Sequence, residues 1–162
     1  MVFRRQSGAN LLLVGQRDEA ALGIMAAALV CLAAQRSPEA ARFFILDGSP
    51  IDSPHANVLR DIADLLPHTA RMVNFRDVAE AIDELAREMQ ARLATTLPAA
   101  ADMYVLIYGL QRYRGLRRQE DDFGLSSLEA EATVSADRQF AELLREGPAL
   151  GMHTLAWLDT PA

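Results

Sequence analysis

The sequence predicts an α/β domain: a three-layer sandwich in which a mostly parallel sheet of five or more strands carries helices on both faces. Two observations predict this fold. Short apolar runs alternate with longer helical patterns along the whole chain, as in parallel strands joined by crossover helices. The chain has 162 residues, 51% hydrophobic and 23% charged, so it can bury the core of one globular domain.

Five segments are predicted to be strands and four to be helices. The clearest strand is 103–108, which is apolar throughout. The first strand, 11–14, is apolar on both faces, as expected of a strand in the interior of a parallel sheet. The remaining strands are expected at 42–46, 71–74 and 153–158, and the helices at 17–35, 55–66, 75–94 and 135–146.

The first helix is unusual because the run from Ala20 to Ala34 contains only apolar residues. A membrane span needs about 20 such residues, so this run is predicted to be a core helix, apolar all round. The one cysteine, Cys31, lies in it and is predicted to be a buried structural thiol. A single cysteine fits a reducing, cytoplasmic setting. The net charge of −6 argues against a large non-specific nucleic-acid surface.

A glycine and a helix follow the first strand at once, which is the strand–loop–helix layout of a phosphate-binding P-loop. If Gly15 begins the motif G-x-x-x-x-G-K-[ST], the second glycine, the lysine and the hydroxyl are replaced by Ala20, Ala21 and Leu22. No other lysine can substitute, because all 16 basic residues are arginines. The predicted vestigial nucleotide loop comprises Gly15, Gln16, Arg17, Asp18, Glu19, Ala20, Ala21 and Leu22.

These residues lack the chemistry of a working P-loop. Ala21 and Leu22 can neither donate to phosphate nor hold Mg²⁺. Asp18 and Glu19 stabilise the helix dipole from within and would repel a triphosphate. The alternative is an ordinary β-turn-α unit that was never related to a P-loop, and this stretch alone leaves both interpretations open.

The fourth strand is the second place to look for ATPase chemistry. A Walker B strand ends in an aspartate that holds Mg²⁺. Here the strand is followed by Tyr108 and Gly109, which are predicted to be a vestigial Walker B without a carboxylate. No catalytic residue is proposed. No metal site is proposed either, because His55 and His68 lack cysteines or carboxylates at metal-ligand spacing.

A basic segment follows that strand, with four arginines in seven residues. One interpretation is an arginine supplied in trans to the ATP of a neighbouring subunit, or a contact to a polymer in a ring pore. The other is a solvated loop whose charge is balanced by Glu120-Asp121-Asp122. The four residues are Arg112, Arg114, Arg117 and Arg118.

Four stretches resemble an FtsK/SpoIIIE-type ATPase domain, in particular the degenerate copies in large multi-ATPase members of that superfamily. They are residues 8–15, 105–109, 145–153 and 157–161. The most specific match is Gly151-Met152-His153, where the family has Gly-Ile-His. The family's last strand leads into Ala-Thr-Gln-Arg-Pro, whose glutamine senses nucleotide. Asp159 occupies the position of that glutamine as a vestigial sensor.

The resemblance implies a RecA-like P-loop NTPase fold, with residues 1–162 forming one degenerate FtsK-like domain of a larger protein. With the catalytic residues missing, it implies an inactive domain without a cofactor and with a structural, regulatory or partner-binding role. Its partners would be neighbouring ATPase domains of the same or a homologous chain in an oligomer, and a peptide or DNA substrate. The expected location is the cytoplasm, in a parent protein that is membrane-associated.

Two alternatives stay open. The first is an ATP-binding motor domain of a DNA or protein translocase that retains weak binding of ATP and Mg²⁺. The second is an unrelated flavodoxin-like domain that binds an anion at Gly15 to Glu19. Strand order separates the second alternative from a RecA-like sheet.

Overall fold

The computed structural model describes residues 1–95, 100–117 and 135–159, and the structural statements below concern these residues. They form the predicted α/β fold around a five-stranded sheet, all parallel, in the order β1-β5-β4-β2-β3. The strands are β1 (Leu11–Val14), β2 (Ala41–Asp47), β3 (Thr69–Met72), β4 (Asp102–Tyr108) and β5 (Met152–Leu158). The helices are α1 (Asp18–Ala33), α2 (Val58–Leu65), α3 (Val78–Ala94) and α4 (Ala136–Glu146).

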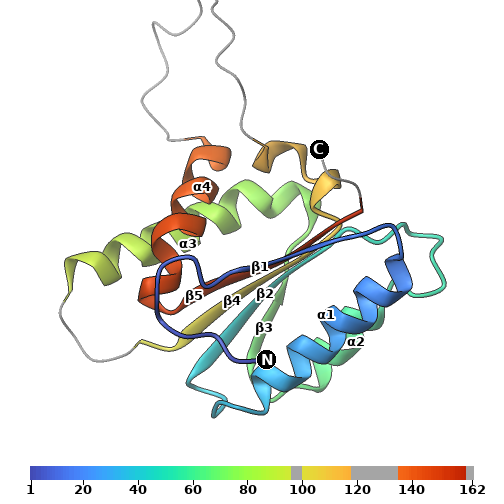
Figure 1. Ribbon diagram of the computed structural model, residues 1–162, viewed down its shortest axis with the longest axis horizontal. Helices are drawn as coiled ribbons and strands as arrows, with labels where there is room; N and C mark the ends of the chain where they lie inside the picture. The colour runs from blue at the N-terminus through green and yellow to red at the C-terminus, as the bar shows by residue number, and fades with distance from the viewer. Residues whose placement is uncertain (96–99, 118–134, 160–162) are drawn as a thin grey trace, which may run out of the picture.

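The sheet separates two layers of helices (Figure 1), with α1 and α2 on one face and α3 and α4 on the other. Successive residues of a strand point to opposite faces, so the central strand β4 contributes side chains to the core on both sides of the sheet. Leu106 packs in the cluster beneath α1 and α2, and Val105 and Ile107 pack in the cluster beneath α3 and α4. Every residue of β4 is buried. The predicted three-layer sandwich is therefore confirmed.

The elements lie close to their predicted positions. The third strand differs most, because it begins and ends two residues earlier than predicted. The third strand covers Thr69–Met72 instead of 71–74. It ends earlier because Asn74 leaves the sheet and leads into a short 3₁₀ helix at Phe75–Asp77, where its side chain donates to Asp77 at 3.0 Å.

The prediction that the first strand lies inside the sheet is wrong. Within the part of the chain that the structure describes, β1 pairs only with β5 and forms one edge of the sheet. Leu12 and Val14 are more than half exposed. A strand that is apolar on both faces therefore marks an uncovered edge here, and not a central position.

The expectation that α1 is a core helix on all sides is also wrong. One side of the helix packs on the sheet through residues such as Met25 and Leu29, which are fully buried. On the other side Ile24 and Val30 are nearly half exposed, and Cys31 is an exposed free thiol. The helix is apolar all round, but only half of its surface is covered.

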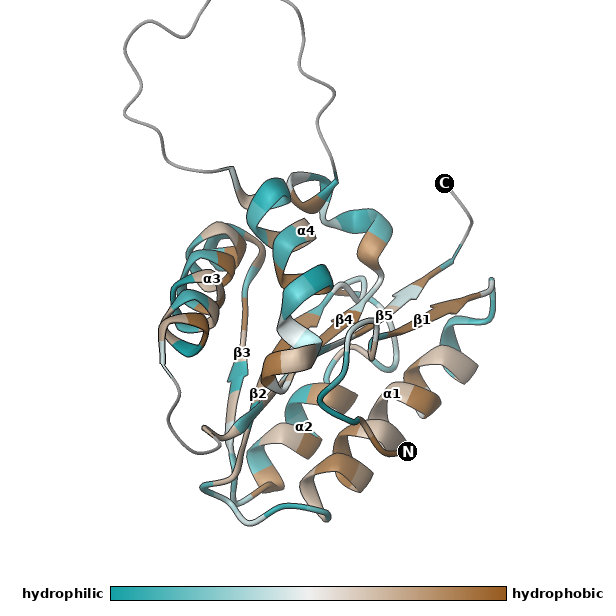
Figure 2. Ribbon diagram, turned by 60° about the vertical axis from the view of Figure 1, so that its left-hand side comes forward, coloured by the Kyte–Doolittle hydropathy of each residue, from teal (hydrophilic) through white to brown (hydrophobic). Residues whose placement is uncertain are grey.

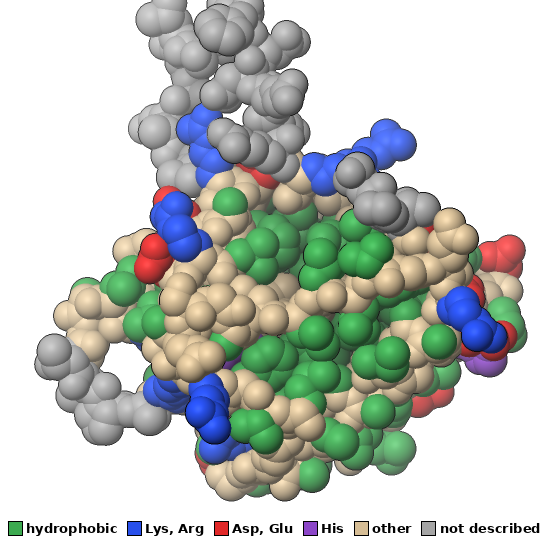
Figure 3. Space-filling view, in the orientation of Figure 1, with side chains coloured by type: hydrophobic (Ala, Val, Ile, Leu, Met, Phe, Trp, Pro, Cys, Tyr) green, Lys and Arg blue, Asp and Glu red, His purple; other side chains and the backbone are tan. Residues whose placement is uncertain are grey.

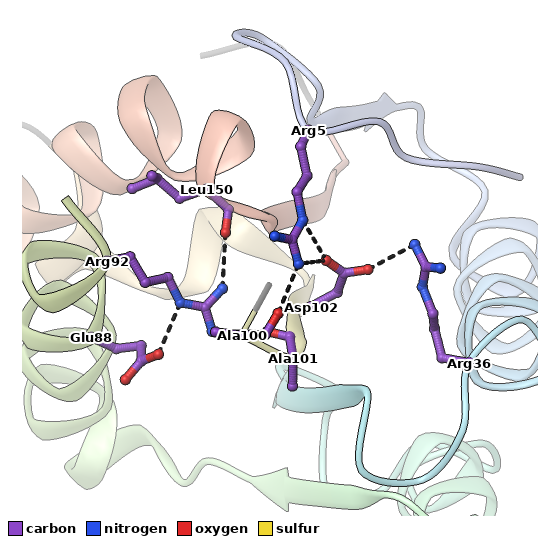
Figure 4. A network of polar contacts seen from close by, with 8 residues as sticks. All are labelled: Arg5, Arg36, Glu88, Arg92, Ala100, Ala101, Asp102 and Leu150. Atoms are coloured by element: carbon purple, nitrogen blue, oxygen red, sulfur yellow. Dashed lines mark hydrogen bonds and ion pairs between the residues drawn. The ribbon is translucent and has the colours of Figure 1, made fainter. Parts of the chain in front are cut away.

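Polar contacts close the sheet at the amino end of β4 (Figure 4). The buried Asp102 carboxylate accepts hydrogen bonds from Nε and Nη2 of Arg5, at 3.1 and 2.7 Å, and pairs with Nη2 of Arg36 at 2.8 Å. Asp102 raises the pKa of Arg36 above its ordinary value. Gly151 makes room for this carboxylate, since a Cβ there would lie 2.7 Å from Asp102 Oδ1.

Another arginine, Arg92, whose side chain is 10% exposed, joins α3 to the same end of the sheet (Figure 4). It pairs with Glu88 at 2.9 Å and donates to the carbonyls of Leu150 and Ala101 at 2.9 and 2.8 Å. The contacts of Asp102 hold the N-terminal segment and the end of α1 at the start of β4. The contacts of Arg92 hold α3 and the turn before β5 there.

We expect Asp102→Asn to lower the free energy of unfolding by about 2 kcal/mol, because an amide N–H₂ would then face guanidinium donors in a buried site. Urea denaturation measures this change. The control is Glu84→Gln, which breaks the more exposed Arg71–Glu84 pair and should cost less than about 1 kcal/mol. Equal costs for the two variants would contradict the structural role of Asp102.

Candidate functional site

Ligands of open parallel sheets bind beyond the carboxyl ends of the strands. At that end the segments that follow β1, β2, β4 and β5 lie against one another. The Gly15 amide donates to the carbonyl of Leu158 at 3.0 Å, and the Gly48 amide donates to the carbonyl of Tyr108 at 2.8 Å. Gly48 permits this approach, because a Cβ there would lie 2.6 Å from the Tyr108 oxygen.

The turn between β1 and α1 is shorter than the predicted vestigial loop of residues 15–22, and α1 begins one residue after its predicted start at 17. It has three residues, Gly15 to Arg17, and α1 begins at Asp18. Residues 18–22 of the predicted vestigial loop lie in the first turns of the helix, where Ala21 and Leu22 are each 5% exposed and pack in the core. A phosphate cradle needs a longer run of free backbone N–H groups, so this turn has no room for one.

Two stacked aromatic residues, Tyr108 and Trp157, hold both ends of this turn. Their rings lie 4.6 Å apart at 24°, and both side chains are buried. The indole Nε1–H of Trp157 donates to the carbonyl of Gly15 at 3.0 Å. The hydroxyl of Tyr108 donates to the carbonyl of Asp18 at 3.2 Å. We call Tyr108 and Trp157 the aromatic pair.

Tyr108 of the aromatic pair stands at the position predicted to be a vestigial Walker B. Tyr108 is the last residue of β4, and Gly109 follows it with a φ of 79°. Burial, with smaller contributions from Asp18 and Asp47, raises the pKa of Tyr108 to about 12. The phenol is therefore a neutral hydrogen-bond donor at physiological pH, and it cannot hold Mg²⁺ as a carboxylate does.

Two of the described arginines that follow β4, Arg112 and Arg114, line one cleft of about 200 Å³ together with Phe75 and Arg76. Arg112 also donates from Nη1 to the carbonyl of Gly48, so it joins the ends of β4 and β2. Arg117 donates to the carbonyl of Gln111 at 3.1 Å. Arg118, and the acidic run predicted to balance these charges, lie outside the described residues.

The remaining residues singled out in the sequence have simple structural surroundings. His153 is buried against structural neighbours: its Nδ1 lies 2.8 Å from the carbonyl of Ala9 and its ring stacks on Phe3, while burial lowers its pKa. Asp159 follows β5 at the same sheet end as the turn. A cleft of about 520 Å³ lies at the other end around Arg5 and Arg36, whose charges Asp102 already neutralises in part.

Sequence reasoning did not identify the hydrogen bond from Trp157 to the turn. Trp157 and Tyr108 are register partners on adjacent parallel strands, and this relation becomes visible only once β4 and β5 are known to be neighbours. Within the described ranges, no cluster of three potential metal ligands occurs. No helix among them is both long and apolar enough to cross a membrane.

We expect Tyr108→Phe to lower the free energy of unfolding by about 1 kcal/mol at neutral pH, through loss of the bond to Asp18. The folded pKa of about 12 exceeds the ordinary value of 10.0, so this tyrosine stabilises the fold below pH 10 and loses that contribution as pH rises toward 12. Denaturation of both proteins across that range should show a steeper decline for the wild type.

Tyr113→Phe provides a matched control. The Tyr113 hydroxyl is buried without a hydrogen-bond partner among the described residues, so removing it should leave stability at neutral pH unchanged or raised. If Tyr113→Phe were as destabilising as Tyr108→Phe, the bond from Tyr108 to Asp18 would not be the cause.

No family model and no curated protein matches this chain. Solved structures do match. One is the cytoplasmic domain of the Thermomonospora curvata type VII secretion ATPase EccC, with a TM-score of 0.66 and 13% identity over 96% of this chain and 16% of that chain. Another is T. curvata EccC (ATPases 2 and 3) in complex with a signal sequence peptide, with a TM-score of 0.66 and 13% identity over 96% of this chain and 25% of that one.

At 13% identity the similarity establishes the fold. The chain corresponds to a quarter or less of the length of these neighbours. Its all-parallel sheet with helices on both faces is the RecA-like P-loop ATPase fold predicted from the sequence.

Proposed function

We propose that this domain is a catalytically inactive P-loop ATPase-like domain with a structural and partner-binding role in a larger FtsK/SpoIIIE-family ATPase. The observation that carries this proposal is the three-residue turn between β1 and α1, with both ends held by the aromatic pair. A nucleotide would have to open this turn and break both hydrogen bonds before its phosphates could reach the backbone.

The charges at the turn support the same proposal. Phosphate binding in this fold uses a lysine, a hydroxyl and a metal-holding carboxylate. The positions that would supply the first two are Ala21 and Leu22, which are buried in the core. Asp18 and Glu19 occupy the first turn of α1, where their negative charges oppose a triphosphate. We therefore assign no nucleotide cofactor to the domain.

The proposed partners are neighbouring ATPase domains of the same or a homologous chain. Two facts support this assignment: the fold neighbours are long ATPase chains of which this domain matches one part, and one of them was solved with a signal sequence peptide. Between the two substrates considered, a peptide is favoured over DNA, because a net charge of −6 opposes binding of a polyanion. The proposed setting is the cytoplasmic part of a secretion-type assembly.

Isothermal titration with Mg·ATP tests the proposal. We expect no saturable heat at millimolar ATP, which corresponds to a binding free energy weaker than about −4 kcal/mol. The control variant Asp18→Asn with Glu19→Gln removes the repulsive charges. It should also show no saturable heat, because the turn offers no backbone cradle for phosphate. Micromolar binding by the wild-type chain would instead support the alternative, a translocase motor domain that still binds nucleotide.

A further inference from the structure

Three parts of the chain meet at the cleft of about 200 Å³: the start of α3, the start of α4, and the 3₁₀ turns at Leu110–Arg112 and Arg114–Leu116 that follow β4 (Figure 1). Its lining contains three arginines, Arg76, Arg112 and Arg114, and no carboxylate. Where the turns meet the start of α4 the ribbons are largely hydrophilic, in contrast to α1 (Figure 2). We call this site the arginine cleft.

Two other clefts differ from the arginine cleft in charge. The cleft of about 520 Å³ contains Glu39 and Asp102 beside its arginines, and a cleft of about 320 Å³ contains Asp47 beside its arginine. In both, carboxylates offset the positive charge. In the arginine cleft, by contrast, Arg76 and Arg114 make no ion pair among the described residues. Their charges are therefore available to an anion.

The lining also holds a buried hydroxyl without a partner. Tyr113 is 3% exposed, and its hydroxyl makes no hydrogen bond among the described residues, which is costly for a buried polar group. Its ring stacks on that of Phe75, another lining residue, with the ring centroids 4.6 Å apart at 18°. Burial raises the pKa of Tyr113 above its ordinary value, so the hydroxyl keeps its proton and can donate to an anion.

The N-terminal ends of both helices line the same cleft. α3 contributes its first two residues, Val78 and Ala79, and α4 contributes its first residue, Ala136. The first N–H groups of a helix have no partner within the helix, and the helix dipole gives this end a partial positive charge. Neither helix has a side-chain cap at this end. Helix starts of this kind favour the binding of anions.

The acids near these elements do not line the cleft. The Asp47 carboxylate accepts from the Ser49 amide at 2.9 Å, and the Asp77 carboxylate accepts from the Asn74 side chain at 3.0 Å. Asp137, in the first turn of α4, is buried.

The net charge of −6 does not prevent a local basic site. Charges more than about 8 Å apart are largely screened at physiological ionic strength. The surface is also uneven: in one view hydrophobic side chains cover the middle of the molecule, and arginines and acids stand around its rim (Figure 3).

We propose that the arginine cleft binds a single phosphate group. Its three arginines and two helix starts match a charge of about −1.5 to −2, which a phosphate group carries and a lone carboxylate does not. Arginines and a phenol donate to phosphate oxygens. A volume of about 200 Å³ lies below the roughly 300–1,000 Å³ of pockets that enclose larger ligands, so the cleft suits one phosphate group and not a nucleotide.

This site goes beyond the proposed structural role of the domain. It also differs from an arginine supplied in trans to the nucleotide of a neighbour, because all of its donors belong to one chain. The phosphate has two sources with the same chemistry, the free ion and a phosphorylated side chain, and the experiment below separates them.

The test titrates inorganic phosphate into the ¹⁵N-labelled full chain at constant ionic strength and neutral pH. We expect saturable shifts of the Val78, Ala79 and Gly115 amides at millimolar phosphate. O-phosphoserine forms the second arm and should shift the same amides. Tighter binding of O-phosphoserine would assign the site to a phosphorylated side chain, and equal binding would assign it to the free ion; both results support a phosphate site.

A pair of arginine variants locates the site. Arg76 and Arg114 are exposed and unpaired among the described residues, so Arg76→Ala with Arg114→Ala should preserve the fold and lower phosphate affinity at least about tenfold. The control is Arg42→Ala with Arg60→Ala, which removes the same charge from two exposed positions outside the arginine cleft. It should bind phosphate like the wild type.

Tyr113→Phe separates binding from stability. This variant is expected to fold as stably as the wild type or more so, and its phosphate affinity should fall about threefold or more through loss of one donor. A hydroxyl without a ligand would affect neither property in that direction.

Gly115→Asp places a competing carboxylate in the cleft. A Cβ at this lining residue would meet no atom within 4 Å, so the side chain fits, and its charge should abolish the phosphate shifts. Gly115→Ala is the matched control and should bind phosphate like the wild type.

The acids that follow this segment in the sequence, Glu120-Asp121-Asp122, lie outside the described residues, so the experiment includes their neutral variant. Glu120→Gln with Asp121→Asn and Asp122→Asn should leave phosphate affinity unchanged. A rise of about tenfold or more, equivalent to about 1.4 kcal/mol, would show that the chain's own acids fill the cleft and would overturn the inference.

Three further results would overturn it: no saturable shift at millimolar phosphate, equal losses in the two double-arginine variants, or unchanged binding by Tyr113→Phe. Failure of the proposed function is a separate event. ATP binding at the β1–α1 turn would move the Trp157 indole resonance and leave the phosphate shifts of the arginine cleft intact, so the two failures are distinguishable.

Discussion

The two hydrogen bonds that the aromatic pair donates to the β1–α1 turn are the constraint on which the rest of the structure's chemistry depends. Trp157 comes from β5, the neighbour of β1, and Tyr108 comes from β4, the next strand in the sheet. They bond to the carbonyls of Gly15 and Asp18 from within the core. In the proposed function, this one pair of residues accounts for the loss of both halves of an ATPase site.

With the carboxyl end closed by the aromatic pair and the amino end held by Asp102, the sheet is fixed at both ends. Among the described residues, β1 and the outer face of α1 expose apolar side chains. The proposed structural role of the domain requires neither nucleotide nor metal.

Alternating apolar runs were sufficient to predict the strands, the helices and the parallel sheet, since local pattern determines these features. They could not reveal that β1 is an edge, because a strand that is apolar on both faces looks the same at the centre and at an uncovered edge. The apolar residues of α1 likewise predicted a helix covered on all sides, because sequence alone does not show which side of an apolar helix is exposed. The contact between Arg5 and Asp102 joins residues 97 positions apart, and the aromatic pair depends on the register of β4 and β5. Neither leaves a local signal.

The central claim is that the β1–α1 turn is closed, and the indole N–H of Trp157 reports on it directly. This chain has one tryptophan, so its indole gives a single resonance in a ¹H–¹⁵N spectrum, and that proton is bonded to Gly15. A closed turn predicts that the resonance stays in place when Mg·ATP is added to millimolar concentration. A saturable shift of the indole peak, together with the Gly15 amide, would show that nucleotide opens the turn and would contradict the account.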